Sequence, residues 1–214
     1  MDEWRTVTVA PERLVRWLEG FGVRHGRPEA RLDGATLTLV APDGAVAALT
    51  TRWPEVPAGD DPVATFVALA TRPRRVGVLL VRRERHAVGL ADGGVVVTVR
   101  AGRHYVQGRT KAGGWSQQRY ARRRDNQARH AYAAAADDAA QVLEPEAASL
   151  EGLLRGGDAA GLDAVLADPR LVRTAALARR IPLPRLEVGD PTREALAAFP
   201  ARYAAVTVRL NQLA

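Results

Sequence analysis

Residues 75–100 read RVGVLLVRRERHAVGLADGGVVVTVR, and this stretch decides the fold. Its first part, 75–82, is a continuous apolar run, which is typical of a central strand that is buried on both faces. Two further apolar segments, 86–90 and 95–100, are separated by the turn sequence Asp92-Gly93-Gly94. Together with another strand expected at 104–108, these segments predict an antiparallel β-meander.

The residues after the meander predict alternating helices and strands. A glycine-containing loop at 110–115 leads into a long helix, for which Ser116 is the expected N-cap. We then expect a strand near 150–154, a helix at 159–167, more helix to residue 180, a short strand near 185–188, and a last helix that starts at Asp190-Pro191. This order predicts an α/β fold with a mixed sheet, in which a meander is followed by alternating helices and strands.

Residues 1–60 are expected to form an N-terminal elaboration. Apolar residues at helical spacing predict a helix at 11–21, and the turn sequence Pro42-Asp43-Gly44 predicts a hairpin within 35–51. The segment 53–62 is dense in proline, aspartate and glycine, which favours a boundary or hinge there, and a helix is expected at 62–71. We therefore expect two parts, residues 1–60 and a main domain of residues 61–214.

The composition excludes several classes of site. The chain has no cysteine, so disulfides, thiolate catalysis and cysteine-based metal sites are impossible. The four histidines lack metal-ligand spacing, and we predict neither a metal nor another cofactor. No apolar run reaches the length of a signal peptide core or a membrane span, which predicts a cytoplasmic protein without a membrane partner.

Positive charge is concentrated in one segment. Residues 100–130 contain nine basic residues and one acid, a net +8, whereas the whole chain carries +7, so the remaining residues carry −1. A local basic field of this kind is typical of a polyanion site, most often nucleic acid, and the alternative is a solvated helix face.

The long helix separates its apolar and basic residues onto two faces. At about 100° per residue, one stripe is apolar and the opposite face is basic or polar. The stripe comprises Ala121, Ala128, Tyr132, Ala135, Ala139 and Leu143, and the opposite face comprises Arg119, Arg122, Arg123, Asn126, Arg129 and His130. The helix is therefore expected to pack on the sheet with its arginines outward.

The loop before this helix is the sharpest local motif, in the string GRTKAGGWSQQRYARRR at 108–124. Gly113 and Gly114 permit positive φ and leave backbone N–H groups uncovered, so a substrate can approach the main chain closely. The N-terminus of the following helix adds N–H donors and a positive dipole, which suit a phosphate or a developing oxyanion.

This string resembles the catalytic tip of class I release factors of the eukaryotic and archaeal type, in which a basic Gly-Gly-Gln loop enters a helix with an Arg-aromatic-Ala-Arg pattern, here residues 119–122. It resembles more closely the actinobacterial branch of the VLRF-type release-factor-like domains of ribosome quality control, in which K-x-G-G-x-S-Q leads into an arginine-rich helix with a downstream Asp-Asn-Gln. The residues that fit are Lys111, Gly113, Gly114, Ser116, Gln117, Asp125, Asn126 and Gln127. The resemblance implies a fold like the release-factor middle domain.

The resemblance also implies a function, that of a peptidyl-tRNA hydrolase in ribosome rescue or ribosome-associated quality control. Its partners would be the large ribosomal subunit and peptidyl-tRNA, and we expect a monomer. Gln117, presented by Gly113 and Gly114, is the expected catalytic amide, with Gln118 as the alternative. The residues expected to contact RNA are Arg109, Lys111, Trp115, Arg119, Arg122, Arg123 and Arg129. Two other functions stay open, RNA cleavage at the tRNA CCA end and a non-catalytic ribosome- or RNA-binding module.

Overall fold

The computed structural model describes residues 4–54, 59–103 and 115–214, the last range without the side chains of 115–127. The chain forms two compact units: unit 1 contains Met1–Pro73 and Ala201–Ala214, and unit 2 contains Arg74–Pro200. The chain thus enters unit 2 after Pro73 and returns to unit 1 after Pro200. This division differs from the expected boundary at residue 60, because residues 62–71 pack in the core of unit 1 and the C-terminal strand completes its sheet.

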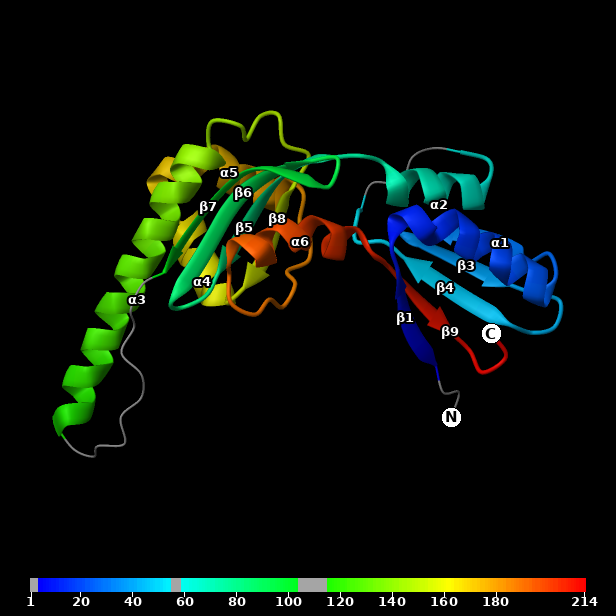
Figure 1. The fold of residues 1–214 in the computed structure, drawn as a ribbon, viewed down its shortest axis with the longest axis horizontal. Coiled ribbons are helices and arrows are strands. Elements are labelled where there is room, and N and C mark those ends of the chain that lie inside the picture. The colour runs from blue at the N-terminus through cyan, green and yellow to red at the C-terminus, as the bar shows by residue number, and fades with distance from the viewer. Residues whose placement is uncertain (1–3, 55–58, 104–114) are drawn as a thin grey trace. The chain divides into compact units, whose positions relative to one another are not determined.

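Unit 1 is a five-stranded antiparallel sheet with helices on one face (Figure 1). Its strands are β1 (Arg5–Val9), β2 (Glu29–Asp33), β3 (Thr36–Val40), β4 (Val46–Thr50) and β9 (Val206–Leu210), in the order β1-β9-β4-β3-β2. The helices are the 3-10 turn η1 (Pro11–Arg13), α1 (Leu14–His25) and α2 (Pro62–Thr71). The expected helices and the expected hairpin, β3–β4, are confirmed, whereas β1, β2 and β9 were not predicted.

Local chemistry explains how α2 starts. The Asp61 side chain accepts hydrogen bonds from the backbone N–H of Val63 at 2.8 Å and of Ala64 at 3.1 Å, and Pro62 occupies the first helical position. Phe66 on α2 and Phe21 on α1 then join one core with the inward residues of the sheet. The two helices are therefore held on the same face of unit 1.

Unit 2 is built on a four-stranded mixed sheet. Its strands are β5 (Arg75–Val81), β6 (Arg85–Asp92), β7 (Val95–Arg103) and β8 (Leu153–Gly157), in the order β7-β6-β5-β8. Strand β8 pairs in parallel with β5, and the other pairs are antiparallel. Every residue of β5 after Arg75 is buried. The α/β class, the meander and the mixed sheet are confirmed, and the strand expected at 104–108 lies outside the described residues.

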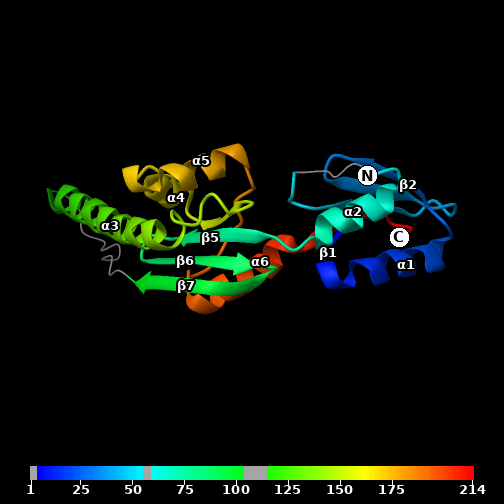
Figure 2. The ribbon, with the colours of Figure 1, turned by 90° about the horizontal axis from the view of Figure 1, so that it is seen from above.

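Helices cover both faces of this sheet (Figure 2). On one face lie α3 (Trp115–Val142), α4 (Ala159–Leu166), the 3-10 turn η2 (Pro169–Leu171) and α5 (Val172–Arg180). The first turns of α6 (Arg193–Ala204) cover the other face. A Cβ at Gly156 in β8 would lie 2.8 Å from Phe199, so glycine allows α6 to pack closely there. Both faces of β5 are buried for this reason.

Three local expectations are corrected. Helix α3 begins at Trp115, so Ser116 lies inside its first turn rather than before it. The last helix begins at Arg193, and the Thr192 hydroxyl accepts the backbone N–H of Ala195 at 3.1 Å, so Thr192 takes the capping role expected of Asp190. Near 185–188 the structure has a single bridge between Gly156 and Leu186 instead of a strand.

Among the described parts of the chain, no helix is both long enough and apolar enough to cross a membrane.

Glu144 connects the end of α3 to the start of α5. Its carboxylate accepts the backbone N–H groups of Arg173 and Thr174, each at 2.9 Å, and the Thr174 hydroxyl at 2.7 Å. Burial on its own raises the pKa of Glu144, but these hydrogen bonds outweigh burial and lower the pKa below its ordinary 4.5. The carboxylate therefore partners amides in the first turn of α5 that have no acceptor within the helix.

We expect Glu144→Gln to lower the free energy of unfolding at pH 7 by about 1–2 kcal/mol, the usual size of a lost helix cap. Because the folded-state pKa is depressed, the stabilisation is complete above pH 4.5 and is lost as the pH falls through the folded-state pKa. Denaturant unfolding between pH 7 and pH 3 measures both effects, and the difference between the two proteins should shrink at the acidic end. Glu187→Gln is the control, because that side chain is 80% exposed. Equal effects of the two substitutions at pH 7 would rule out the capping role.

Candidate functional site

The candidate site lies on the first half of α3. Among the described side chains of this helix, Arg129 and His130 are exposed, and Ala131 is the first that is buried. At 1.5 Å per residue, the helix start at Trp115 lies about 24 Å along the axis from Ala131. Figure 1 shows this half of α3 extending beyond the sheet of its own unit. The first turn is thus carried at the end of a long arm.

The second half of α3 is held by small apolar residues. Ala135, Ala139 and Leu143 are buried in one cluster with Leu79 of β5 and Val88 of β6. Alanine combines the best helix propensity with the smallest side chain that can pack, so it favours the helix and lets its axis approach the sheet. Among the described residues, the expected stripe from position 132 to 143 and the outward position of 129 and 130 are confirmed.

A polar anchor accompanies this packing. Asp138 lies 2.9 Å from Nε2 of His86 on β6, and it accepts a hydrogen bond of 3.3 Å from Nη1 of Arg100 on β7. The His86 side chain is only 3% exposed. A Cβ at Gly102 on β7 would collide with the His86 ring, so this glycine leaves room for the imidazole beneath α3. The anchor therefore joins α3 to two strands.

The neighbouring Asp137 contacts η2 from another side of the helix. Its carboxylate accepts a 2.6 Å hydrogen bond from Arg170 in η2, which also donates to Asp168. The side-chain and backbone hydrogen bonds of Arg170 lower the pKa of Asp168 to about 2. Adjacent residues on a helix point in different directions, and here the two acids fix α3 to the sheet and to the helical layer.

The residues predicted to react or to contact RNA are only partly described. Arg109, Lys111, Gly113 and Gly114 lie outside the described residues. Trp115, Gln117, Gln118, Arg119, Arg122 and Arg123 belong to α3 by its bounds, and of their side chains nothing is described. Arg129 is described, and it is exposed. The helix bounds bring Gln117 and Gln118 into the first turn of α3.

Sequence reasoning missed the anchor of Asp138, His86 and Arg100. The sequence signals were His86 within an apolar strand and Asp138 at the margin of the apolar stripe of the helix, and only the tertiary fold brings these two residues together. Elsewhere, His25 lies 2.8 Å from Asp43, while His130 is exposed and His104 is outside the described residues. Across residues 4–54, 59–103 and 128–214, no three His, Asp or Glu side chains are grouped so that they could hold a metal ion.

Two solved structures are similar to parts of the chain. The archaeal translation termination factor aRF1 has 16% identity and a TM-score of 0.43, and the similarity covers 77% of this chain and 49% of that one. A structure described as an archaeal protein has 15% identity and a TM-score of 0.37, covering 94% of this chain and 67% of that one. The chain thus spans about half the length of aRF1.

A search of curated proteins found no match. Residues 74–209, more than half of the chain, match the family described as the Actinobacteria/chloroflexi VLRF1 release factor. The matched region starts at the first residue of unit 2 and includes all of α3. The chain therefore belongs to the Actinobacteria/chloroflexi VLRF1 release factor family, which confirms the resemblance drawn from the motif at residues 108–127.

Proposed function

We propose that this release-factor family member hydrolyses the ester bond of peptidyl-tRNA, with Gln117 as the catalytic amide. The observation that carries the proposal is the place of Gln117 in the first turn of a helix that projects from unit 2 of a release-factor family member. The partners are the large ribosomal subunit and peptidyl-tRNA. The chain acts as a cytoplasmic monomer without a metal or other cofactor, and its catalytic part is unit 2, Arg74–Pro200, which lies within the expected range 61–214.

The start of α3 offers suitable groups for ester hydrolysis. A glutamine amide does not titrate, so it cannot act as a general base, but it can orient a water molecule beside the ester carbonyl. The first backbone N–H groups of a helix have no acceptor within the helix, and the backbone N–H of Gln117 is one of these groups. Such a donor stabilises the oxyanion that forms when water attacks the carbonyl carbon.

The products follow from the bond that breaks. The water oxygen bonds to the carbonyl carbon, and the bond from that carbon to the ribose oxygen breaks. The ribose oxygen takes a proton, which leaves a peptide with a free carboxylate and a tRNA that keeps its CCA end with a free hydroxyl. Gly113 and Gly114 leave the main chain uncovered for close approach to the ester. Ribosomal RNA supplies the rest of the site.

The basic face of α3 supplies affinity in this proposal. Arg119, Arg122, Arg123 and Arg129 contact phosphates, as do Arg109 and Lys111, and Trp115 stacks on a base. An arm of about 24 Å suits a narrow RNA-lined centre, because a single helix is only about 10–12 Å wide with its side chains. The amide can thereby reach an ester that the body of unit 2 cannot approach.

We expect Gln117→Ala to lower peptide release by about 10²-fold or more, the size of effect seen when one positioned donor is removed. Ribosome binding should change little, because the arginines supply the affinity. Release from ribosome-bound peptidyl-tRNA under single-turnover conditions measures the rate. Gln118→Ala is the matched control and should retain most of the activity.

Three outcomes would contradict parts of this prediction. Loss of activity in Gln118→Ala alone would move the catalytic amide by one residue. Wild-type release by both variants would favour the non-catalytic binding module. Released tRNA that lacks its 3′ nucleotides and ends in a cyclic phosphate would assign CCA-end cleavage instead of hydrolysis.

Asp138→Asn should reduce release several-fold, although Asp138 lies about 30 Å along the helix axis from Gln117. The substitution weakens the charge-assisted contacts with His86 and Arg100 that orient α3. Asp163→Asn is the control, because Asp163 is an exposed acid on α4. Release rates at saturating ribosome concentration should fall only for Asp138→Asn. Equal rates for the two variants would exclude an orienting role of the anchor.

Reversal of Arg122 and Arg129 to glutamate should flatten the salt dependence of ribosome binding. Each lost phosphate contact removes about 0.7–0.9 from the slope of log affinity against log salt concentration. Arg179 and Arg180, exposed at the end of α5, provide a control double reversal with the same change of charge. An unchanged slope in the folded Arg122/Arg129 variant would identify a merely solvated helix face.

A further inference from the structure

Strand β1 is an open edge of the sheet in unit 1. Among the described strands it pairs with β9 alone, so one row of its backbone N–H and C=O groups faces away from the sheet. Proteins usually protect such edges with charges, proline or bulges. The opposite edge, β2, carries three charged residues among five, Glu29, Arg31 and Asp33, whereas β1 carries one, Arg5, followed by only threonine and valine at 6–9. Edge β1 therefore has less of the usual protection against pairing than β2.

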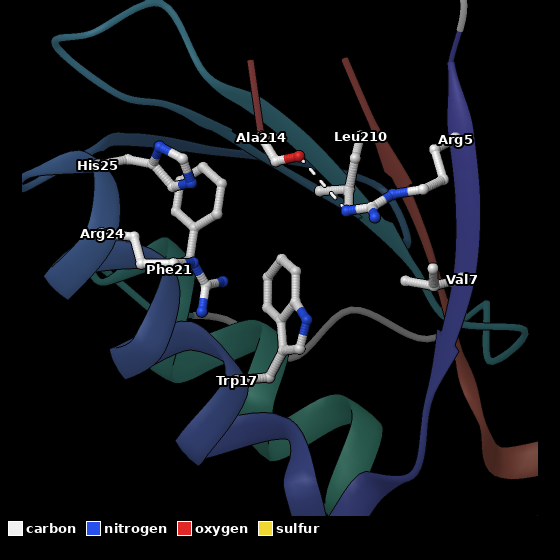
Figure 3. Close-up of a pocket in the computed structure, with 8 residues that line it drawn as sticks. All are labelled: Arg5, Val7, Trp17, Phe21, Arg24, His25, Leu210 and Ala214. Atoms are coloured by element: carbon white, nitrogen blue, oxygen red, sulfur yellow. Dashed lines mark hydrogen bonds between the residues drawn. The ribbon is translucent and has the colours of Figure 1, made fainter. Parts of the chain in front are cut away.

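A groove runs between this edge and α1 (Figure 3). Two hollows of about 430 and 570 Å³ both include Val7 of β1 and Trp17 of α1 in their lining, so they adjoin. Figure 3 shows Trp17 reaching from α1 toward the side of the groove that carries Val7. Its ring stacks on Phe21 with centroids 5.7 Å apart. The floor of the groove is thus aromatic and apolar.

The groove also bends around the edge of the strand. The larger hollow includes Thr8 as well as Val7 and Val9, and successive residues of a strand point to opposite faces. A ligand in this hollow would lie beside the backbone of β1 and not only over one face. The main-chain groups of the edge and the apolar floor are therefore available to the same ligand.

One end of the groove is basic. The smaller hollow is lined by Arg5, Arg24 and His25, and its described lining includes no acidic residue. His25 is already bound to Asp43 at 2.8 Å, which leaves Arg5 and Arg24 as the cations at this end. Arg5 also donates a long 3.4 Å hydrogen bond to the carbonyl of Ala214. The charge at this end suits a carboxylate.

We propose that this groove binds an extended segment of a partner protein, which adds to the sheet as a strand beside β1. About five residues of the segment pair with β1, alternate apolar side chains lie against Trp17 and Val7, and an acidic residue lies at Arg5 and Arg24. A peptide fits better than RNA, because a nucleic acid has no row of N–H and C=O groups to match a strand edge. The proposal is independent of the proposed catalysis.

A random dodecapeptide library displayed on phage, selected on the full chain, tests the proposal. Enriched peptides should alternate apolar and polar residues and carry aspartate or glutamate near one end. Synthetic copies should bind at least tenfold more weakly to Trp17→Ala and to the double variant Arg5→Glu/Arg24→Glu in fluorescence anisotropy. Val23→Ala is the matched control on α1, because Val23 is 87% exposed and lines neither hollow.

Hydrogen exchange distinguishes strand addition from simple surface binding. On peptide binding, hydrogen exchange should slow at least tenfold at the outward backbone amides of β1. N-methylation of every second peptide amide should abolish binding when the methylated amides are those that face β1, and should have little effect when they are the other set. The Arg5/Arg24 variant keeps the test valid if Trp17→Ala does not fold. The proposal is overturned if no enriched peptide depends on Trp17 or on the two arginines. It is also overturned if a ten-nucleotide single-stranded RNA binds in a Trp17-dependent way and the peptides do not.

Discussion

The burial of the second half of α3 against β5 and β6 is the interaction on which the rest of unit 2 depends. Among the described side chains of α3, those that enter the core start at Ala131, so this half holds the direction in which the first half points. A helix start about 24 Å from the first buried residue moves by about 4 Å when the axis tilts by about 10°. A positioned catalytic group tolerates far less than that. The contacts of Asp138 and Asp137 at the base therefore matter for direction as well as for stability, because they hold the helix from two sides.

Local sequence patterns predicted those elements of the fold that carry their own periodicity. The apolar run of β5, the turn at Asp92-Gly93 and the alanine stripe of α3 each specify an element within a single segment. Apart from the hairpin β3–β4, the sheet of unit 1 could not be predicted in this way. Strand β9 pairs with β1 and β4 across nearly the whole chain, and five residues with one buried face carry little local signal. The boundary expected near residue 60 differs from the division into units because α2 packs in the core of unit 1 and the last strand joins its sheet, and both are tertiary contacts.

The candidate site was predictable to a different extent. The glycines and glutamines before and within the first turn of α3 could be singled out from the motif, because their chemistry depends on neighbours in the sequence. The anchor beneath α3 could not, because His86 and Asp138 are separated by 52 residues and meet only when the helix lies on the meander. A motif of this kind indicates which group is proposed to react, whereas the contacts that would orient that group depend on tertiary packing. Gly102 is an example, since its role depends on the ring of His86 beside it.

Among the described residues, the carboxylates at the base of α3 with lowered pKa values are Asp168 and Glu144. Strongly shifted carboxylates often mark an active site, because acids and bases must be tuned for proton transfer. In this chain the pKa of Asp168 falls to about 2 through its hydrogen bonds with Arg170, and the pKa of Glu144 is lowered through those with Thr174 and Arg173, which outweigh its burial. Both carboxylates lie at the base of α3 and not at its start. If the reacting group is an amide, no side chain at the tip needs tuning, and charged groups serve instead to hold the arm and to bind phosphates. Under the proposed function, the ionised groups at the base of α3 support a positioned neutral group.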